Sequence, residues 1–187
     1  HIGYGWEDET FDFGDPKNID CLVCHDNTGT YFKQKGRYGW PATKETANDQ
    51  YQVPDYAYVA QNVGKPDKNN CGICHFYGGG GNNVKHGDLE QAIVGCSREV
   101  DVHMTAEGLD MSCIDCHSTE NHNIKGKLYS VSAADTNRIY CTQCHTSEPH
   151  QDMVLDRHFA KVTCQACHIP AYAKKTATKL WWDYTTA

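Results

Sequence analysis

The stretch Cys21-Leu22-Val23-Cys24-His25 carries a Cys-x-x-Cys-His pattern that decides the architecture of this 187-residue chain. The pattern recurs at Cys71–His75, Cys113–His117, Cys141–His145 and Cys164–His168. Together the copies use ten of the eleven cysteines, and each is a signature for covalent attachment of a c-type haem. The sequence therefore predicts five haem c groups with their irons, about one for every 37 residues.

The spacing within the pattern has a physical reason. Two cysteines three residues apart lie on the same side of a helical turn, so both sulfurs can reach the vinyl groups of one porphyrin. The histidine that follows supplies the proximal ligand of the iron. The predicted attachment residues are Cys21, Cys24, Cys71, Cys74, Cys113, Cys116, Cys141, Cys144, Cys164 and Cys167. The predicted proximal ligands are His25, His75, His117, His145 and His168.

Other uses of paired cysteines fit this pattern less well. Structural zinc sites combine two Cys-x-x-Cys knuckles in one tetrahedral centre, which an odd number of knuckles does not satisfy. A thioredoxin-like redox pair would be one motif beside a βαβ pattern. A disulfide framework gives no reason for a histidine after every second cysteine.

The apolar content agrees with a core that is built around cofactor. Leu, Ile, Val and Phe make up 30 residues, or 16% of the chain, a level typical of disorder in proteins without cofactors. Porphyrin faces offer the missing apolar surface, so we expect the chain without haem to be largely unfolded. We predict a multihaem cytochrome c fold of short α-helices and irregular loops around a stacked haem array, with little β-structure. It would be a single domain over residues 1–187, with a denser haem cluster at 113–168.

Local patterns predict short elements. Each motif should lie on a helical turn, and longer helices are expected over Tyr56–Asn62, Asp88–Val94 and Asp152–Lys161. Helix starts are predicted at Asp55 and at Gly87–Asp88. The glycine- and proline-containing segment Gly64–Asn70 is expected to be a loop.

The sixth ligands of the irons are sought among the histidines outside the motifs. These candidate distal ligands are His86, His103, His122, His150, His158 and His1, six residues for five irons. Bis-histidine ligation implies low-potential centres that pass electrons. Methionine is the main alternative ligand, and Lys33 is a candidate axial lysine. Which distal histidine serves which iron stays open.

Cys96 is the one cysteine outside the motifs. Two interpretations stay open for it: a buried free thiol, or an intermolecular disulfide in an oxidising compartment.

Charge and hydropathy limit the partners. The formal net charge is −7 with no basic stripe, which argues against a nucleic-acid partner. No apolar stretch approaches 18 residues, so no membrane span is expected. The chain starts at His1, and we expect a secreted form whose signal peptide is absent from it. Haem c matures outside the cytoplasm, which predicts a periplasmic or extracellular location.

Longer strings resemble the octahaem tetrathionate reductase family of multihaem c-type cytochromes. They are Phe11–Asn18, Cys21–Asp26, Asn62–Pro66, Cys74–Gly81, Val84–Asp88, Asp101–Met104 and Trp181–Asp183. The resemblance implies a periplasmic fold with bis-histidine haems, apart from one lysine-ligated catalytic haem. It also implies reduction of tetrathionate and, in vitro, of nitrite or hydroxylamine. The family carries eight motifs, and the three absent here would lie upstream of His1, with the catalytic haem among them.

Three functional hypotheses follow. The favoured one is electron transfer through five haems, with redox proteins as partners or as a subunit of an extracellular head-to-tail filament (nanowire) in which His1 serves a neighbour's haem. The alternative is a reductase of sulfur or nitrogen oxyanions, with Lys33 as a labile ligand and Lys35 or Arg37 attracting the anion. The third is a fragment of a longer octahaem enzyme. No catalytic residue is assigned beyond the candidate Lys33.

Overall fold

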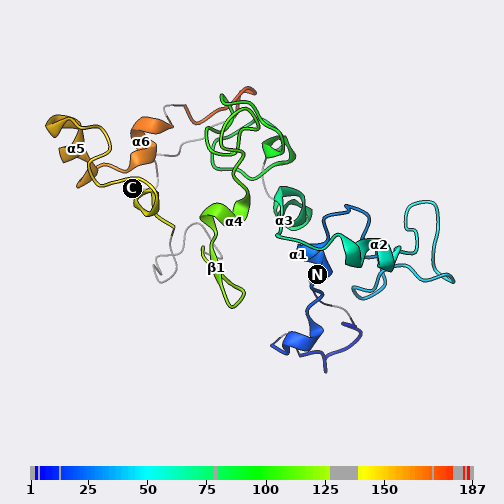
Figure 1. Cartoon of the computed structure of the whole chain (residues 1–187). Helices are drawn as coiled ribbons and strands as arrows, with labels where there is room; N and C mark the ends of the chain where they lie inside the picture. Colours follow the sequence, from blue (N-terminus) through cyan, green and yellow to red (C-terminus); the bar gives the residue numbers. More distant parts are fainter. Residues whose placement is uncertain are drawn as a thin grey trace. The chain divides into compact units, whose positions relative to one another are not determined.

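The computed structural model describes residues 3, 5–12, 14–77, 80–126, 139–169, 171–178, 183 and 185. The chain divides into two compact units, His1–His75 and Phe76–Ala187. Short helices joined by long irregular segments make up both units (Figure 1). The single domain predicted over residues 1–187 stays a prediction.

The first unit contains the first two motifs. Its elements are the 3₁₀-helix η1 (Pro16–Asn18) and the α-helices α1 (Leu22–His25), α2 (Tyr56–Gln61) and α3 (Lys68–His75). Helices α1 and α3, which carry the two motifs, pack against each other. An isolated antiparallel bridge between Asp26 and Val63 joins the chain just after α1 to the chain just after α2.

The second unit contains the other three motifs. Its helices are η2 (Gln91–Ile93), α4 (Cys113–Cys116), η3 (Cys141–Gln143), α5 (Met153–Phe159) and α6 (Cys164–His168). The strands β1 (Thr119–Glu120) and β2 (Asn123–Ile124) form an antiparallel hairpin directly after α4. The described residues thus contain one two-stranded sheet, as the predicted fold class requires.

Most of the helix predictions are confirmed. The carboxylate of Asp55 accepts hydrogen bonds from the backbone N–H groups of Ala57 and Tyr58 and caps α2. Asp152 caps α5 in the same way, through Val154 and Leu155. Four motifs lie on α-helical turns, and the fourth along the chain, at 141–145, begins on a 3₁₀ turn.

Two predictions about local elements are wrong. The helix expected over Asp88–Val94 is reduced to the three residues of η2, because Asp88 and Glu90 are held by lysines from outside the segment. The loop expected over Gly64–Asn70 ends early, at the start of α3. There the carboxylate of Asp67 accepts from the N–H groups of Asn69 and Asn70 and so supports the first turn.

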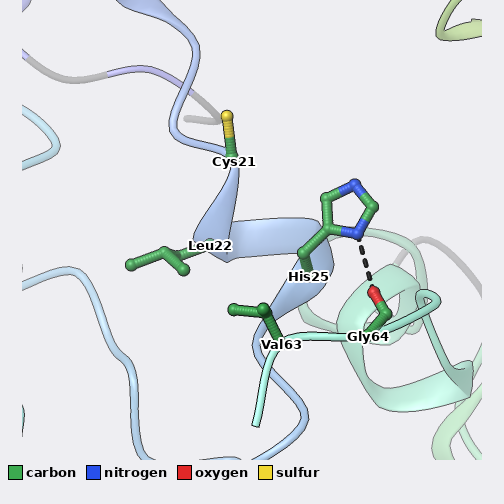
Figure 2. A pocket seen from close by; sticks show the side chains of 5 residues that line it. All are labelled: Cys21, Leu22, His25, Val63 and Gly64. Atoms are coloured by element: carbon green, nitrogen blue, oxygen red, sulfur yellow. Dashed lines mark hydrogen bonds between the residues drawn. The ribbon is translucent and has the colours of Figure 1, made fainter. Parts of the chain in front are cut away.

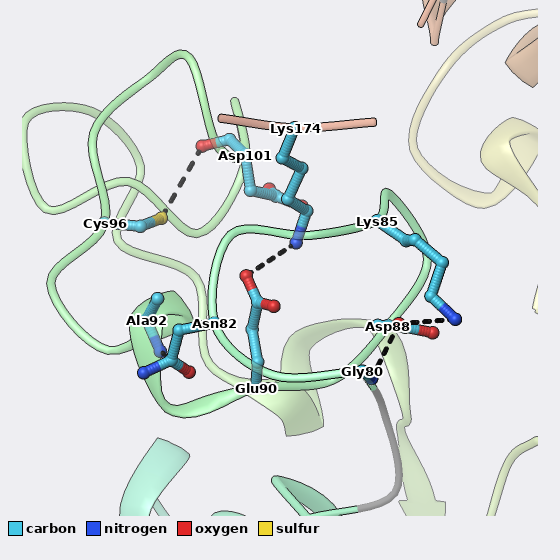
Figure 3. Close-up of polar contacts among 9 residues, drawn as sticks. All are labelled: Gly80, Asn82, Lys85, Asp88, Glu90, Ala92, Cys96, Asp101 and Lys174. Atoms are coloured by element: carbon cyan, nitrogen blue, oxygen red, sulfur yellow. Dashed lines mark hydrogen bonds and ion pairs between the residues drawn. The ribbon is translucent and has the colours of Figure 1, made fainter. Parts of the chain in front are cut away.

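A buried ion pair attaches the C-terminal segment that carries Lys174 to the rest of the second unit. Lys174 Nζ lies 2.9 Å from Glu90 Oε1, and the two side chains are only 4% and 2% exposed (Figure 3). Ala173 in the same segment forms an isolated antiparallel β-bridge with Lys85. The backbone N–H of His86 also donates to the carbonyl oxygen of Tyr172 in this segment, at 2.9 Å. The segment therefore holds the backbone of His86 in place.

The apolar core of the described residues is small. The buried apolar side chains are Tyr31, Ala42, Val59, Phe76, Ile93, Cys96 and Val100. By contrast, 23 large apolar residues are exposed among the described ones, and no described residue between 139 and 169 is buried. The polypeptide by itself thus leaves most of its apolar surface uncovered, and most of all around α5 and α6.

Candidate haem-binding sites

The first motif borders an open cavity of about 390 Å³. Cys21, Leu22, His25, Val63 and Gly64 line it (Figure 2). The ring nitrogen Nδ1 of His25 lies 2.7 Å from the carbonyl oxygen of Gly64, and Figure 2 shows the second ring nitrogen directed away from that bond. A thiol, an imidazole and apolar side chains thus share one concave surface.

The third motif has the same kind of histidine anchor. His117 Nδ1 lies 2.6 Å from the carbonyl oxygen of Lys125, which follows the β1–β2 hairpin. Gly126 lies against the same ring: a Cβ atom at this position would be 3.1 Å from His117 Nδ1 and 3.3 Å from Cε1. The hairpin and the glycine together bring a carbonyl to the imidazole.

These contacts determine which nitrogen can bind iron. A carbonyl oxygen only accepts hydrogen bonds, so Nδ1 must donate in both histidines. In the neutral imidazole, the remaining nitrogen Nε2 then carries a lone pair instead of a proton. An imidazole fixed through Nδ1 in this way is the usual arrangement of a metal-binding histidine. His25 and His117 therefore have the form that a proximal ligand needs.

Motif cysteines from different segments lie near one another within each unit. Partial shielding from water raises the pKa of the Cys24 thiol, and the nearby Cys74 thiol raises it further. In the second unit, burial and the neighbouring Cys144 raise the pKa of Cys116. Burial and contact with Cys164 raise the pKa of Cys141. The structure thus brings motifs one and two together, and joins motif three to four and four to five.

None of the eleven cysteines forms a disulfide, and only Cys96 is buried. Its sulfur lies 4.0 Å from the carbonyl oxygen of Asp101 (Figure 3). The ten motif sulfurs therefore remain accessible for thioether formation, whereas the position of Cys96 agrees with a buried free thiol.

Two candidate distal histidines lie beside motif histidines. The ring centroids of His103 and His145 are 6.1 Å apart with an interplanar angle of 66°. Those of His150 and His168 are 5.8 Å apart with an angle of 12°. His150 also donates from Nδ1 to Asp156 Oδ1 at 3.1 Å. Each pair joins a histidine outside the motifs to one inside a motif.

The remaining distal candidates have different surroundings. His86 is half-buried in the loop that the C-terminal segment fastens. His122 lies exposed in the hairpin turn with a φ of 64°, and His158 lies exposed in the last turn of α5. His1 falls outside the described residues.

Lys33 has a set of structural partners. Its Nζ lies 2.7 Å from Gly3 O, 2.8 Å from Gly39 O and 3.0 Å from Asp20 Oδ2. These three oxygens match the three donors of an ammonium group. Asp20 is 2% exposed and also accepts from the hydroxyl of Tyr31 at 2.6 Å. This arrangement places the Lys33 ammonium against a buried carboxylate. The candidacy of Lys33 as an axial ligand stays a prediction.

Sequence reasoning missed the residues that orient the histidines. The sequence marks Gly64 only as a chain breaker, and it gives no signal for Lys125, Gly126 or Asp156. Gly64 itself carries the acceptor carbonyl at His25, and Gly126 follows the acceptor Lys125 at His117, but the acceptor lies 39 residues from the first ring and 8 from the second. No fixed spacing exists that a motif search could have used.

The surroundings of the motifs fit covalently bound haem. Accessible thiols, oriented imidazoles and an uncovered apolar surface are the three properties that such a group needs. A bare metal ion fits less well, because no group of three or more His, Cys, Asp or Glu residues converges among the described residues. None of the described helices has both the length and the apolar character that a membrane crossing needs.

Comparisons with known proteins give two relatives, and no protein-family model matches the chain. The chain is 31% identical over 127 residues to an uncharacterized protein of Archaeoglobus fulgidus, covering 64% of the chain and 40% of that protein. It also matches the crystal structure of octaheme cytochrome c from Shewanella oneidensis. That match covers 100% of this chain and 39% of the other, at a TM-score of 0.73 and 46% identity. The chain thus spans about two fifths of the length of both relatives.

Proposed function

We propose that this chain, which belongs to the octahaem cytochrome c family of multihaem c-type cytochromes, transfers electrons through five covalently attached haems. When bound, each haem supplies an iron that is oxidised and reduced by one electron. The ten motif cysteines would hold the porphyrins, and His25, His75, His117, His145 and His168 would be the proximal ligands. The observation that carries the proposal is the pairing of motif histidines with second histidine rings.

The distances within these pairs agree with ligation of one iron from both sides. Two imidazoles that held one iron, each by a bond of about 2 Å, would have ring centres about 6 Å apart. The observed separations are 6.1 Å for His103 with His145 and 5.8 Å for His150 with His168. These separations support the proposal that His103 and His150 would be the distal ligands at the sites of His145 and His168. An iron with two imidazoles has no position open for substrate, which favours electron transfer over catalysis.

Neighbouring motifs support a path for electrons within each unit. The first unit would hold two haems side by side on α1 and α3. The second would hold three in the order of the chain, since Cys116 neighbours Cys144 and Cys141 contacts Cys164. His86, His122 and His158 remain proposed distal ligands, and His1 a proposed one at the chain's start. Because haem c matures outside the cytoplasm, we also propose a periplasmic or extracellular location. The filament and the partners at its ends stay predictions.

The test is to determine the haem content and the iron spin states of the purified protein. Intact mass should exceed the polypeptide mass by five haems, and electron paramagnetic resonance should show low-spin ferric iron only. Reversible reduction at low potential, without turnover of tetrathionate, nitrite or hydroxylamine, would support a pure carrier. A high-spin ferric signal together with turnover would instead support the reductase hypothesis. A protein without a Soret band would contradict both.

A further inference from the structure

His150 differs from the anchored motif histidines in the partner of its ring. His25 and His117 donate from Nδ1 to neutral carbonyl oxygens, whereas His150 faces the carboxylate of Asp156. We propose that Asp156 is a positioning residue that lowers the reduction potential of the haem site at Cys164–His168. This inference rests on the proposed function, because it requires a haem whose distal ligand is His150.

One carboxylate oxygen fixes both the ring and the backbone of His150. Asp156 Oδ1 lies 3.1 Å from His150 Nδ1 and 3.2 Å from His150 N. The side chain of Asp156 is 13% exposed and that of His150 is 35% exposed, so the contact is partly shielded from water. Shielding strengthens a charged hydrogen bond, and the two contacts together limit rotation of the imidazole.

Helix α5 holds the carboxylate in place. Asp152 accepts from the N–H groups of Val154 and Leu155 at 2.8 and 3.1 Å, which stabilises the first turn. The N–H of Asp156 in turn donates to the carbonyl oxygen of Asp152 at 2.8 Å. Asp156 thus projects from an anchored helical turn, while His150 comes from the segment before the helix.

The charge of the acceptor determines the effect on the iron. A carboxylate accepts a stronger hydrogen bond than a carbonyl, and it draws the Nδ1 proton further from the ring. The ring then becomes more basic at Nε2 and a stronger electron donor to a bound metal. Ferric iron carries one more positive charge than ferrous iron, so it gains more from such a ligand. The expected consequence is a lower reduction potential at this site.

The experiment is a spectroelectrochemical titration of the holoprotein carrying Asp156→Asn. Asparagine keeps the size and an acceptor oxygen but removes the charge. We expect the preference of one site for ferric over ferrous iron to fall about tenfold. For a one-electron couple this equals a rise of about 59 mV in the reduction potential of that site. The other four potentials should stay unchanged, and intact mass should still show five haems. Unchanged potentials throughout would overturn the proposal.

Asp152→Asn is the matched control, because it removes the same charge from the same helix end and keeps the cap. Asp152 makes no hydrogen bond to His150 among those found in the described residues, and its carboxylate instead accepts from the N–H groups of Val154 and Leu155. We expect at most a third of the rise seen with Asp156→Asn. A rise as large as that of Asp156→Asn would show a general effect of charge and overturn the positioning role.

His150→Ala separates this inference from the proposed function. If His150 is the distal ligand, one of five irons becomes high-spin, and Asp156→Asn in that background no longer changes any potential. If all five irons stay low-spin in His150→Ala, the inference about Asp156 fails, whereas the proposed electron transfer through haems is not contradicted. If the unmodified protein binds no haem, the proposed function itself fails.

Discussion

At the scale of single residues, the histidine environments are set by their backbone partners. His25 and His117 each donate to a carbonyl oxygen at 2.7 and 2.6 Å, and a glycine lies at each contact. At Gly64 a Cβ atom would collide with the Asn27 side chain, and at Gly126 it would press on the His117 ring. The chain therefore uses glycine where the backbone approaches a motif histidine.

Gly126→Ala should disturb the third haem site. Gly126 has a φ of 144°, which costs a non-glycine residue about 1–3 kcal/mol, and its new methyl group would meet the His117 ring at 3.1 Å. We expect lower stability in urea and a broadened low-spin signal from one haem. Gly36→Ala is the control, since Gly36 also has positive φ, 77°, but open space around it. Equal spectra for both variants would contradict the role of Gly126.

Lys33→Met should reduce stability without changing iron ligation. It leaves the buried Asp20 carboxylate with the Tyr31 hydroxyl but without its ion pair, a loss of about 3 kcal/mol by analogy with other broken buried pairs. Denaturant unfolding of the holoprotein measures this loss. The ferric spin state should stay low-spin at all sites. Appearance of one high-spin iron would instead show that Lys33 is an axial ligand.

At the scale of elements, helix-capping residues are good predictors of structure, whereas charged residues that pair with partners distant in sequence are not. Asp55 could be recognised from sequence because an N-cap acts on the next three residues. The prediction of a helix over Asp88–Val94 fails because the contact that matters there is not local. Glu90 there pairs with Lys174, which lies 84 residues away, and such a contact leaves no local pattern.

The turn after the first motif makes the stability of the fold depend on pH. Asp26 accepts from the N–H and hydroxyl of Thr28 and from the N–H of Tyr31, at 2.9, 2.6 and 3.2 Å. Although burial opposes the charged form, these hydrogen bonds dominate and lower the pKa of Asp26 below 3.8. A carboxylate with a lowered folded-state pKa adds stability above its unfolded pKa, and the gain is lost as pH falls through the folded value.

Asp26→Asn should therefore be less stable than the unmodified protein at pH 7, by about 1 kcal/mol. The difference should shrink only below about pH 4, where the unfolded carboxyl takes up its proton. Denaturant unfolding at a series of pH values measures both effects. Thr28→Val is a useful companion, because it removes the 2.6 Å hydroxyl contact and keeps the charge. A difference that is constant from pH 7 to pH 2 would contradict this account.

At the scale of the whole molecule, the sequence was sufficient for the fold class and the five motifs, whereas the pairing of histidine rings is visible only in the structure. The motif is local, so five residues define it wherever it occurs. His103 and His145 are 42 positions apart and His150 and His168 are 18 apart, and no rule of spacing links them. The ring contacts thus come from how loops cross within the second unit, which composition and periodicity do not encode.

The last prediction concerns the chain without its cofactor. Only seven apolar residues are buried among the described ones, against 23 large exposed apolar residues, so the polypeptide alone has little apolar burial to offset its conformational entropy. We expect a variant with serine at all ten motif cysteines to lack a cooperative thermal transition, while the haem-loaded protein unfolds cooperatively. Far-UV circular dichroism with temperature measures both, and a Cys96→Ser variant controls for loss of a thiol outside the motifs. A cooperative transition in the haem-free chain would mean that packing among side chains, rather than porphyrin, holds this fold.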